Sequence, residues 1–169
     1  EKAGLILTSF EGRTLEKLKP NLPAAAGLVN PIDVIGDAGV DRYQAALEAC
    51  GDDAGIDGLC VLLTPQVMTP CKEIAQAIAD WNKAYPLMPV TTSFMGAESV
   101  GDARDVLAEH QIPTFETPER AIKALATLTP LAGCQVGTVE TCKHENLPTN
   151  SAAQALLKGK SGLIDEATP

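Results

Sequence analysis

Short apolar runs alternate with amphipathic stretches along the first 128 residues of the chain. The strongest apolar run covers residues 58–63, where turn residues bound a Leu-Cys-Val-Leu-Leu segment. A continuous apolar run of this length is typical of a strand that is buried on both faces of a parallel sheet. Further strands are predicted at residues 5–8, 89–94 and 112–115.

Helices are predicted between these strands. Apolar side chains recur at intervals of three and four, and this period indicates helices with one buried face. The predicted helices cover residues 14–18, 39–49, 70–85, 99–109 and 118–128. The regular alternation of strands with helices predicts βαβ units and an α/β fold with a doubly wound parallel sheet.

Two helix starts carry capping signals. Thr69 is the expected N-cap of a helix whose first residue is Pro70. Ser99 and Asp102 have the spacing of a capping box. In a doubly wound sheet, ligands meet the loops beyond the carboxyl ends of the strands. These loops are residues 30–36, 64–69, 93–99 and 116–118.

Composition and charge narrow the classes of partner. Residues 1–130 are expected to form one domain, and residues 131–169 a turn-rich linker and tail that packs little against it. A net charge of −9 argues against a nucleic-acid partner, whereas a small anion held by backbone N–H groups stays compatible with it. Neither a bilayer-spanning run nor a signal peptide is recognised, so we expect a cytoplasmic location.

The chain has five cysteines, an odd number without the dense spacing of a disulfide framework. Cys134, Cys142, His144 and Glu145 lie close together in the sequence and raise the question of a metal site. Their spacing fits no standard zinc pattern. We therefore predict reduced thiols and no metal site.

Four segments, in order along the chain, carry a resemblance to a known family. Residues 30–37 read Asn-Pro-Ile-Asp-Val-Ile-Gly-Asp, residues 63–69 Leu-Thr-Pro-Gln-Val-Met-Thr, residues 93–99 Ser-Phe-Met-Gly-Ala-Glu-Ser, and residues 117–121 Thr-Pro-Glu-Arg-Ala. Together they resemble the third, flavodoxin-like domain in the alpha part of ADP-forming acetyl-CoA synthetases and other NDP-forming acyl-CoA synthetases. This domain is related to succinyl-CoA ligases.

The resemblance implies a part in a larger ligase, which interconverts acyl-CoA, nucleoside diphosphate and phosphate with acid, CoA and triphosphate. A histidine of another domain carries the phosphate, and an ATP-grasp part binds the nucleotide. The implied cofactors of the whole enzyme are CoA, ADP or ATP, phosphate and Mg, none of them bound by this chain. The implied partners are CoA-binding and ATP-grasp domains or subunits in an oligomer, with no nucleic acid and no membrane.

Three departures from the family pattern stand out. Residues 151–166, in the tail expected to lead towards a fused or separate ATP-grasp part, resemble the family less than the four segments do. The pattern begins with a strand ahead of residues 1–7, so we expect the sheet of this chain to lack its first strand. Ala97 stands where many relatives carry a second glycine, which reduces the close backbone approach that glycine permits.

By this resemblance, the loop before the helix at residue 70 helps to seat the phosphohistidine loop, because free N–H groups and the helix dipole favour a dianion. Its candidate residues are Thr64, Pro65, Gln66, Thr69 and Cys71. The candidate supporting residues are Asn30, Asp33, Ser93, Gly96 and Glu98. No catalytic residue is expected in the chain.

Each candidate has a plainer structural interpretation. Most helix N-termini bind nothing, and the side chains of Asn30 and Asp33 beside Pro31 are typical of residues that close turns. Cys71 has either a thiol pKa lowered by the helix N-terminus or, as we favour, an inert buried thiol. Trp81 is predicted to lie in the core.

Two other functions stay open at this stage. One is a non-catalytic regulatory or scaffold domain, as in a protein-lysine acetyltransferase with a synthetase-like part. The other is a simple flavodoxin-like binding or receiver module. No acidic pair with a following phosphoacceptor aspartate closes the first predicted strand, which argues against a receiver.

Overall fold

The computed structural model describes residues 3–128, which lie in the first of two units of the chain, Glu1–Gln135. The elements in chain order are α1 (Gly12–Leu18), α2 (Val40–Gly51), β1 (Leu59–Leu63), α3 (Cys71–Ala84), β2 (Val90–Phe94), the 3₁₀ helix η1 (Ala97–Val100), α4 (Gly101–Glu109) and α5 (Pro118–Leu128). The expected linker and tail, residues 131–169, lie outside the described residues.

The strands β1 and β2 pair in parallel, from Leu59 opposite Val90 to Leu63 opposite Phe94. A parallel bridge between Thr92 and Thr114 adds a third line of chain beside β2. The parallel pairing and the alternation of strands with helices confirm the predicted α/β class.

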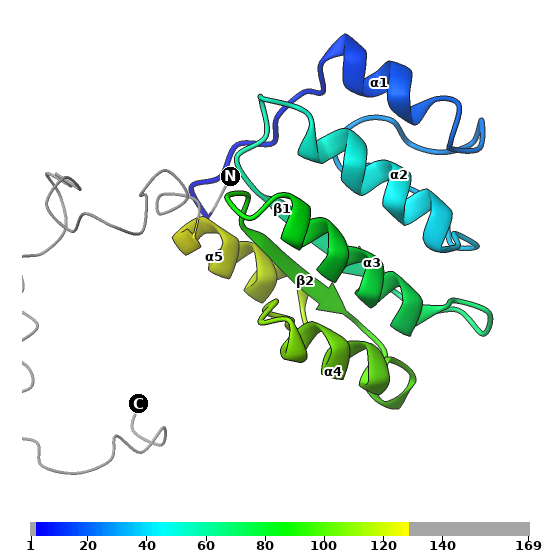
Figure 1. Cartoon of the computed structure of the whole chain (residues 1–169), viewed down its shortest axis with the longest axis vertical. Coiled ribbons are helices and arrows are strands. Elements are labelled where there is room, and N and C mark those ends of the chain that lie inside the picture. The colour runs from blue at the N-terminus through cyan, green and yellow to red at the C-terminus, as the bar shows by residue number, and fades with distance from the viewer. Residues whose placement is uncertain (1–2, 129–169) are drawn as a thin grey trace, which may run out of the picture. The chain divides into compact units, whose positions relative to one another are not determined.

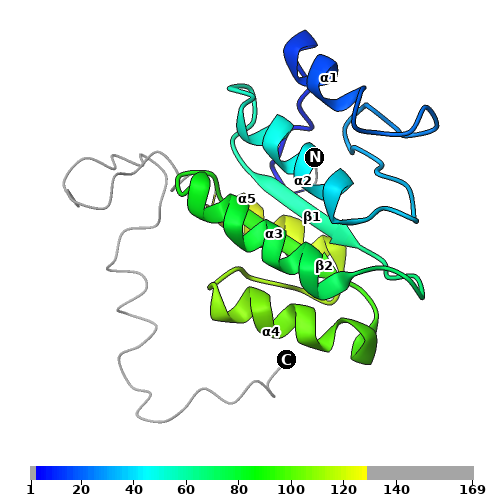
Figure 2. The ribbon, with the colours of Figure 1, turned by 45° about the vertical axis from the view of Figure 1, so that its right-hand side comes forward.

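Helices lie on both faces of this small sheet (Figures 1 and 2). The side chains of Leu63 and Phe94 pack with Ile74 and Ile78 of α3 and Leu107 of α4 in the main core. The opposite face is covered by α5, where Thr91 Oγ1 donates to the carbonyl of Ala121 at 3.1 Å. Successive side chains of a strand point to opposite faces, so Leu63 and Phe94 lie on the face covered by α3 and Thr91 lies on the face covered by α5.

A second, smaller core lies under α1 and the chain that follows it. Leu18, Leu22 and Ala49 are buried there. The predicted helix at residues 14–18 is present and begins two residues earlier, at Gly12. Trp81 is buried in the main core, as predicted.

The predicted strand at residues 5–8 is wrong. These residues have no strand pairing, and Ile6 and Leu7 are 91% and 64% exposed. A strand forms only where a neighbouring strand satisfies its backbone groups, and within residues 3–128 no strand pairs with this segment. Apolar pattern alone was therefore insufficient.

The segment at residues 112–115 forms a single bridge instead of the predicted strand. Thr92 N donates to Pro113 O, and Phe115 N donates to Thr92 O, both at 2.9 Å. Pro113 has no N–H to extend the ladder. The next acceptor along β2, Phe94 O, is taken by the Arg104 guanidinium at 2.7 Å. The pairing ends there for these two reasons.

The prediction that the 58–63 strand is buried on both faces holds for one face. Val61 and Leu63, which face α3, are buried, whereas Leu62 on the opposite face is 41% exposed. The helix α5 lies mainly against β2 and covers β1 less. Within the described residues, no helix is long and apolar enough to cross a membrane.

Candidate functional site

The loops after β1 and β2 start side by side, because the strands are parallel and their last residues, Leu63 and Phe94, are paired. Met95 N continues the ladder with a 2.9 Å hydrogen bond to Leu63 O. Gly96 then lies against the Pro65 ring, so close that an added Cβ would stand 2.7 Å from Pro65 Cγ. The structure thus brings residues 64–69 together with residues 93–99, the predicted loop at the end of β2.

The predicted loop at residues 30–36 also lies next to residues 64–69, through its last residue, Gly36. Gly36 lies against the carboxamide of Gln66. Pro65 and Gln66 are therefore flanked by two glycines from loops that are distant in sequence. Of the predicted site residues, this cluster contains Pro65, Gln66 and Gly96, with Thr64 and Thr69 on the same loop.

The N-terminus of α3 follows a tight turn. Gln66 N donates to Thr69 Oγ1 at 2.8 Å, and Thr69 N donates to Gln66 O at 3.0 Å. The helix N-cap is Pro70, without a side-chain capping bond, so the prediction of Thr69 as N-cap is wrong. The reason is local: the Thr69 hydroxyl serves the preceding turn, where it competes with capping.

Two N–H groups at the start of α3 are free for a ligand. Cys71 N donates to Thr69 O at 2.9 Å and Ile74 N donates to Pro70 O at 3.0 Å. Between them, the N–H groups of Lys72 and Glu73 have no acceptor within residues 3–128. The helix dipole adds positive potential, while the Glu73 carboxylate in the first turn opposes an anion.

Cys71 is unsuited to nucleophilic chemistry. Its side chain is buried, and Sγ donates to Thr69 O at 3.4 Å. Burial raises the pKa of the Cys71 thiol. The hypothesis of a lowered thiol pKa is therefore wrong, and the interpretation of Cys71 as an inert buried cysteine agrees with the structure.

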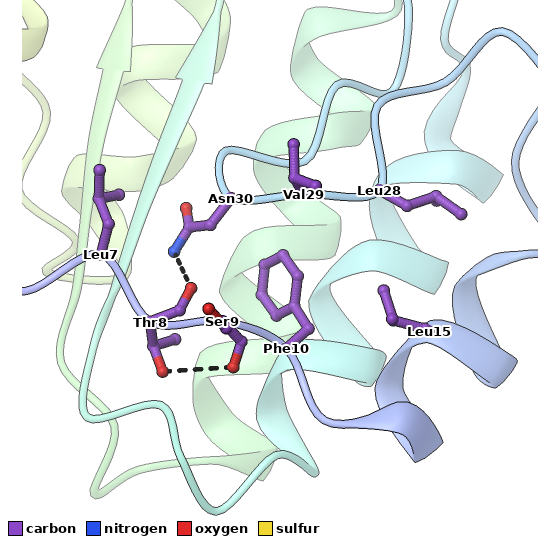
Figure 3. Close-up of a pocket in the computed structure, with 8 residues that line it drawn as sticks. All are labelled: Leu7, Thr8, Ser9, Phe10, Leu15, Leu28, Val29 and Asn30. Carbon is purple, nitrogen blue, oxygen red and sulfur yellow. Dashed lines mark hydrogen bonds between the residues drawn. The ribbon is translucent and has the colours of Figure 1, made fainter.

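Asp33 closes a local turn, whereas Asn30 bonds to a segment that is distant in sequence. Asn30 Nδ2 donates to Thr8 O at 3.1 Å, and Asp33 Oδ1 accepts from Ile35 N at 2.9 Å. Figure 3 shows Asn30 directed at the N-terminal segment, on the rim of an open hollow of about 290 Å³. This hollow is lined by Leu7, Thr8, Ser9, Phe10, Leu15, Leu28, Val29 and Asn30. Asn30 thus lies apart from the Gln66 cluster.

Ser93 and Glu98 also differ from expectation. Ser93 is the fourth residue of β2 and fully buried, on the same face as Thr91, so it does not belong to the loop. Its Oγ has no hydrogen-bond partner among the described residues. Glu98 is exposed in η1. The predicted capping box is absent, because Ser99 Oγ donates to Gly96 O at 2.6 Å.

Backbone strain marks the turn after β2. Gly96 has φ of 152° and Ala97 has φ of 42°. The second value lies in the left-handed region, which costs a residue with a side chain roughly 1–2 kcal/mol. Ala97 thus carries backbone strain, while the expected reduction of close backbone approach at this position stays a prediction.

Two arginines that sequence reasoning did not single out hold the loops in place. Arg104 Nη2 donates to Phe94 O at the end of β2. Arg42 Nη1 donates to Val34 O at 3.2 Å and to Asp37 Oδ1 at 2.6 Å. The Arg42 hydrogen bond holds the pKa of the Asp37 carboxyl below its usual value. Neither contact has a sequence signal, since each joins different elements.

Metal-ligating side chains are not gathered in the described part of the chain: residues 3–128 hold no group of three or more His, Cys, Asp or Glu suited to a metal ion. The four residues considered for a metal site, Cys134, Cys142, His144 and Glu145, lie outside the described residues.

Comparisons with known proteins agree with the family resemblance. No family model matches the chain. It is 31% identical over 128 residues to acetate–CoA ligase [ADP-forming] I of Archaeoglobus fulgidus, covering 76% of this chain and 18% of the relative. It is 42% identical over 125 residues to the acetate–CoA ligase [ADP-forming] of Methanocaldococcus jannaschii, covering 72% and 18%.

Solved structures show the same relation. The apo form of dinucleotide forming acetyl-coenzyme A synthetase 1 of Ca. Korarchaeum cryptofilum aligns with a TM-score of 0.70 and 29% identity. The alignment covers 78% of this chain and 29% of that one.

The fold and these relatives define the chain as a parallel α/β domain of the acyl-CoA ligase class. In particular, it is homologous to a domain-sized part of the ADP-forming acetyl-CoA synthetases, which confirms the resemblance. The chain spans about a fifth of the length of the two curated relatives named above.

Proposed function

We propose that this chain is one domain of a larger NDP-forming acyl-CoA synthetase, and that its α3 N-terminal loop helps to seat a phosphorylated histidine loop from another domain. The enzyme interconverts acyl-CoA, nucleoside diphosphate and phosphate with acid, CoA and triphosphate. The relatives, which are ADP-forming ligases of three to six times the matched length, support the first part.

The observation that carries the second part is the pair of free N–H groups, those of Lys72 and Glu73, next to the clustered loops. Phosphohistidine is a dianion that must be held without hydrolysis. Backbone N–H donors at a helix N-terminus bind such a group and supply no competing base. Gln66 and Thr69 add neutral polar groups on the same loop.

Other domains or subunits would supply the remaining chemistry. One solved relative is described as a complex with phosphate and ADP, and its matched chain is more than three times as long as the matched part. We assign CoA, ADP or ATP, phosphate and Mg to CoA-binding and ATP-grasp parts of a cytoplasmic oligomer.

The test adds one carboxylate at the loop. In the complete enzyme, Gln66→Glu is expected to lower the rate and extent of histidine phosphorylation, because the new charge repels the phosphate, while CoA binding stays normal. Gln111→Glu is the matched control, since it adds the same charge at an exposed position after the end of α4, where the side chain makes no hydrogen bond within residues 3–128. Wild-type phosphorylation by Gln66→Glu would show that the loop is only structural.

A further inference from the structure

The contact between Gly36 and the Gln66 carboxamide leaves no room for a side chain at position 36 while the carboxamide stays in place. An added Cβ at Gly36 would overlap Nε2 of Gln66 and lie 3.2 Å from Gln66 Cδ. The φ of Gly36 is outside the left-handed region, so an alanine could adopt the backbone conformation there. A side chain at position 36 would therefore displace the Gln66 carboxamide, which is the far end of a flexible, exposed side chain, and would not strain the backbone of residue 36.

The loop that carries Gly36 is held on both sides. Arg42 Nη1, on α2, donates to Val34 O and to the Asp37 carboxylate. Asp33 Oδ1 accepts from Ile35 N, and Ala38 N donates to Ile35 O at 3.0 Å. Ile35 has φ of 69°, an unusual value for a β-branched residue, which persists only where the surroundings fix the backbone. Gly36 thus belongs to a loop whose backbone is held in place by hydrogen bonds on both sides of it.

Gln66 is fixed at its backbone but not at its carboxamide. Its N–H and C=O are both bonded to Thr69. The side chain is exposed and makes no hydrogen bond within residues 3–128. The described contact of the carboxamide is with Gly36, so a side chain at position 36 would move the carboxamide elsewhere.

We propose that Gly36 is a positioning residue: its missing side chain lets the Gln66 carboxamide lie against the 33–37 loop, as a neutral hydrogen-bond donor beside the α3 N-terminus. This inference rests on the proposed function, in which that terminus receives the phosphorylated histidine. Gly36 acts through Gln66 and does not touch the phosphate.

A mutant cycle in the complete synthetase tests the coupling. Gly36→Ala is expected to slow histidine phosphorylation by about 10-fold, since misplacement of a positioning group by an ångström costs up to ~100-fold. Gln66→Ala should slow it by a similar factor, and the double variant should be no slower than Gln66→Ala alone. Gly12→Ala is the matched control, because an added Cβ there meets no atom within 4 Å.

A second readout does not depend on activity. In the 169-residue chain labelled with ¹⁵N, Gly36→Ala should shift the side-chain amide resonances of Gln66, whereas Gly12→Ala should leave them in place. Gly36→Ala is expected to fold, because the exposed Gln66 side chain can move away from the added methyl group.

The outcomes distinguish the positioning role of Gly36 from the proposed function of the α3 N-terminal loop. If Gln66→Ala slows phosphorylation but Gly36→Ala changes neither the rate nor the Gln66 resonances, the positioning role is wrong and the proposed function stands. An equal effect of Gly36→Ala in the wild-type and Gln66→Ala backgrounds also overturns it. If Gln66→Ala and Gln66→Glu both phosphorylate like wild type, the site assignment fails, and with it this inference.

Discussion

Thr14 Oγ1 donates a 2.6 Å hydrogen bond to the Asp53 carboxylate, across 39 residues of sequence. Asp53 is 3% exposed and also accepts from Gly55 N at 2.9 Å and from Glu11 N at 3.3 Å. The Asp53 carboxylate thus links the start of α1 to the segment after α2. Both helices contribute to the second, smaller core.

These bonds predict a stability that depends on pH. The Thr14 hydrogen bond lowers the pKa of Asp53, with smaller contributions from Gly55 and Glu11, against burial that raises it. A lowered folded-state pKa means that the stabilisation is present above the unfolded pKa of about 3.9 and is lost as pH falls through the folded value. Asp53→Asn should lower the unfolding free energy by about 1–2 kcal/mol at pH 7.

Urea unfolding of the wild type and Asp53→Asn at pH 7 and pH 3 measures this effect. The difference between the two proteins should shrink at the lower pH. A difference that is the same at both pH values would contradict the assignment to the ionised carboxylate.

The two faces of the sheet should respond differently to truncation. Phe94→Ala should destabilise the chain by about 3–5 kcal/mol, because the ring is fully buried between the sheet and the helices α3 and α4. Leu62→Ala should cost only about 1 kcal/mol, since that side chain is 41% exposed. Chemical denaturation of both variants checks this, and similar losses would show that the α5 face is as well packed as the other.

The turn after β2 should be open to improvement. Ala97→Gly should raise the unfolding free energy by about 0.5 kcal/mol, because glycine removes the left-handed strain but loses more entropy on folding. Ala108→Gly, at an exposed position of α4, should instead lower it by about 1 kcal/mol. Thermal unfolding measures both changes. A loss of stability in Ala97→Gly would mean that the turn is not strained.

The purified chain alone should show no synthetase turnover. We place the phosphohistidine and the nucleotide site of the proposed enzyme in its other parts, and we expect no catalytic residue in this chain. An assay with acetyl-CoA, ADP and phosphate checks this, with the complete enzyme as positive control. Robust turnover by the chain would contradict the proposed division of labour.

Patterns within single segments predicted most of the fold. The apolar run of β1 and the helical spacing of α3 and α5 lie within about one residue of their expected bounds. The meeting of the loops at Pro65 and Gly96 followed from the topology, because parallel strands end at one edge of a sheet. The caps at Thr69 and Ser99 were wrong, since both hydroxyls have a closer turn partner.

The sequence by itself determined the α/β class, the family and the loop in which to seek the site, because periodicity and local motifs are properties of contiguous residues. Only the tertiary structure decided that residues 5–8 do not form a strand, since strand formation needs a neighbour. It also decided the partner of Gly36. That contact depends on how two distant loops are held by Arg42 and by the turn at Thr69, and no local pattern encodes the distance between them.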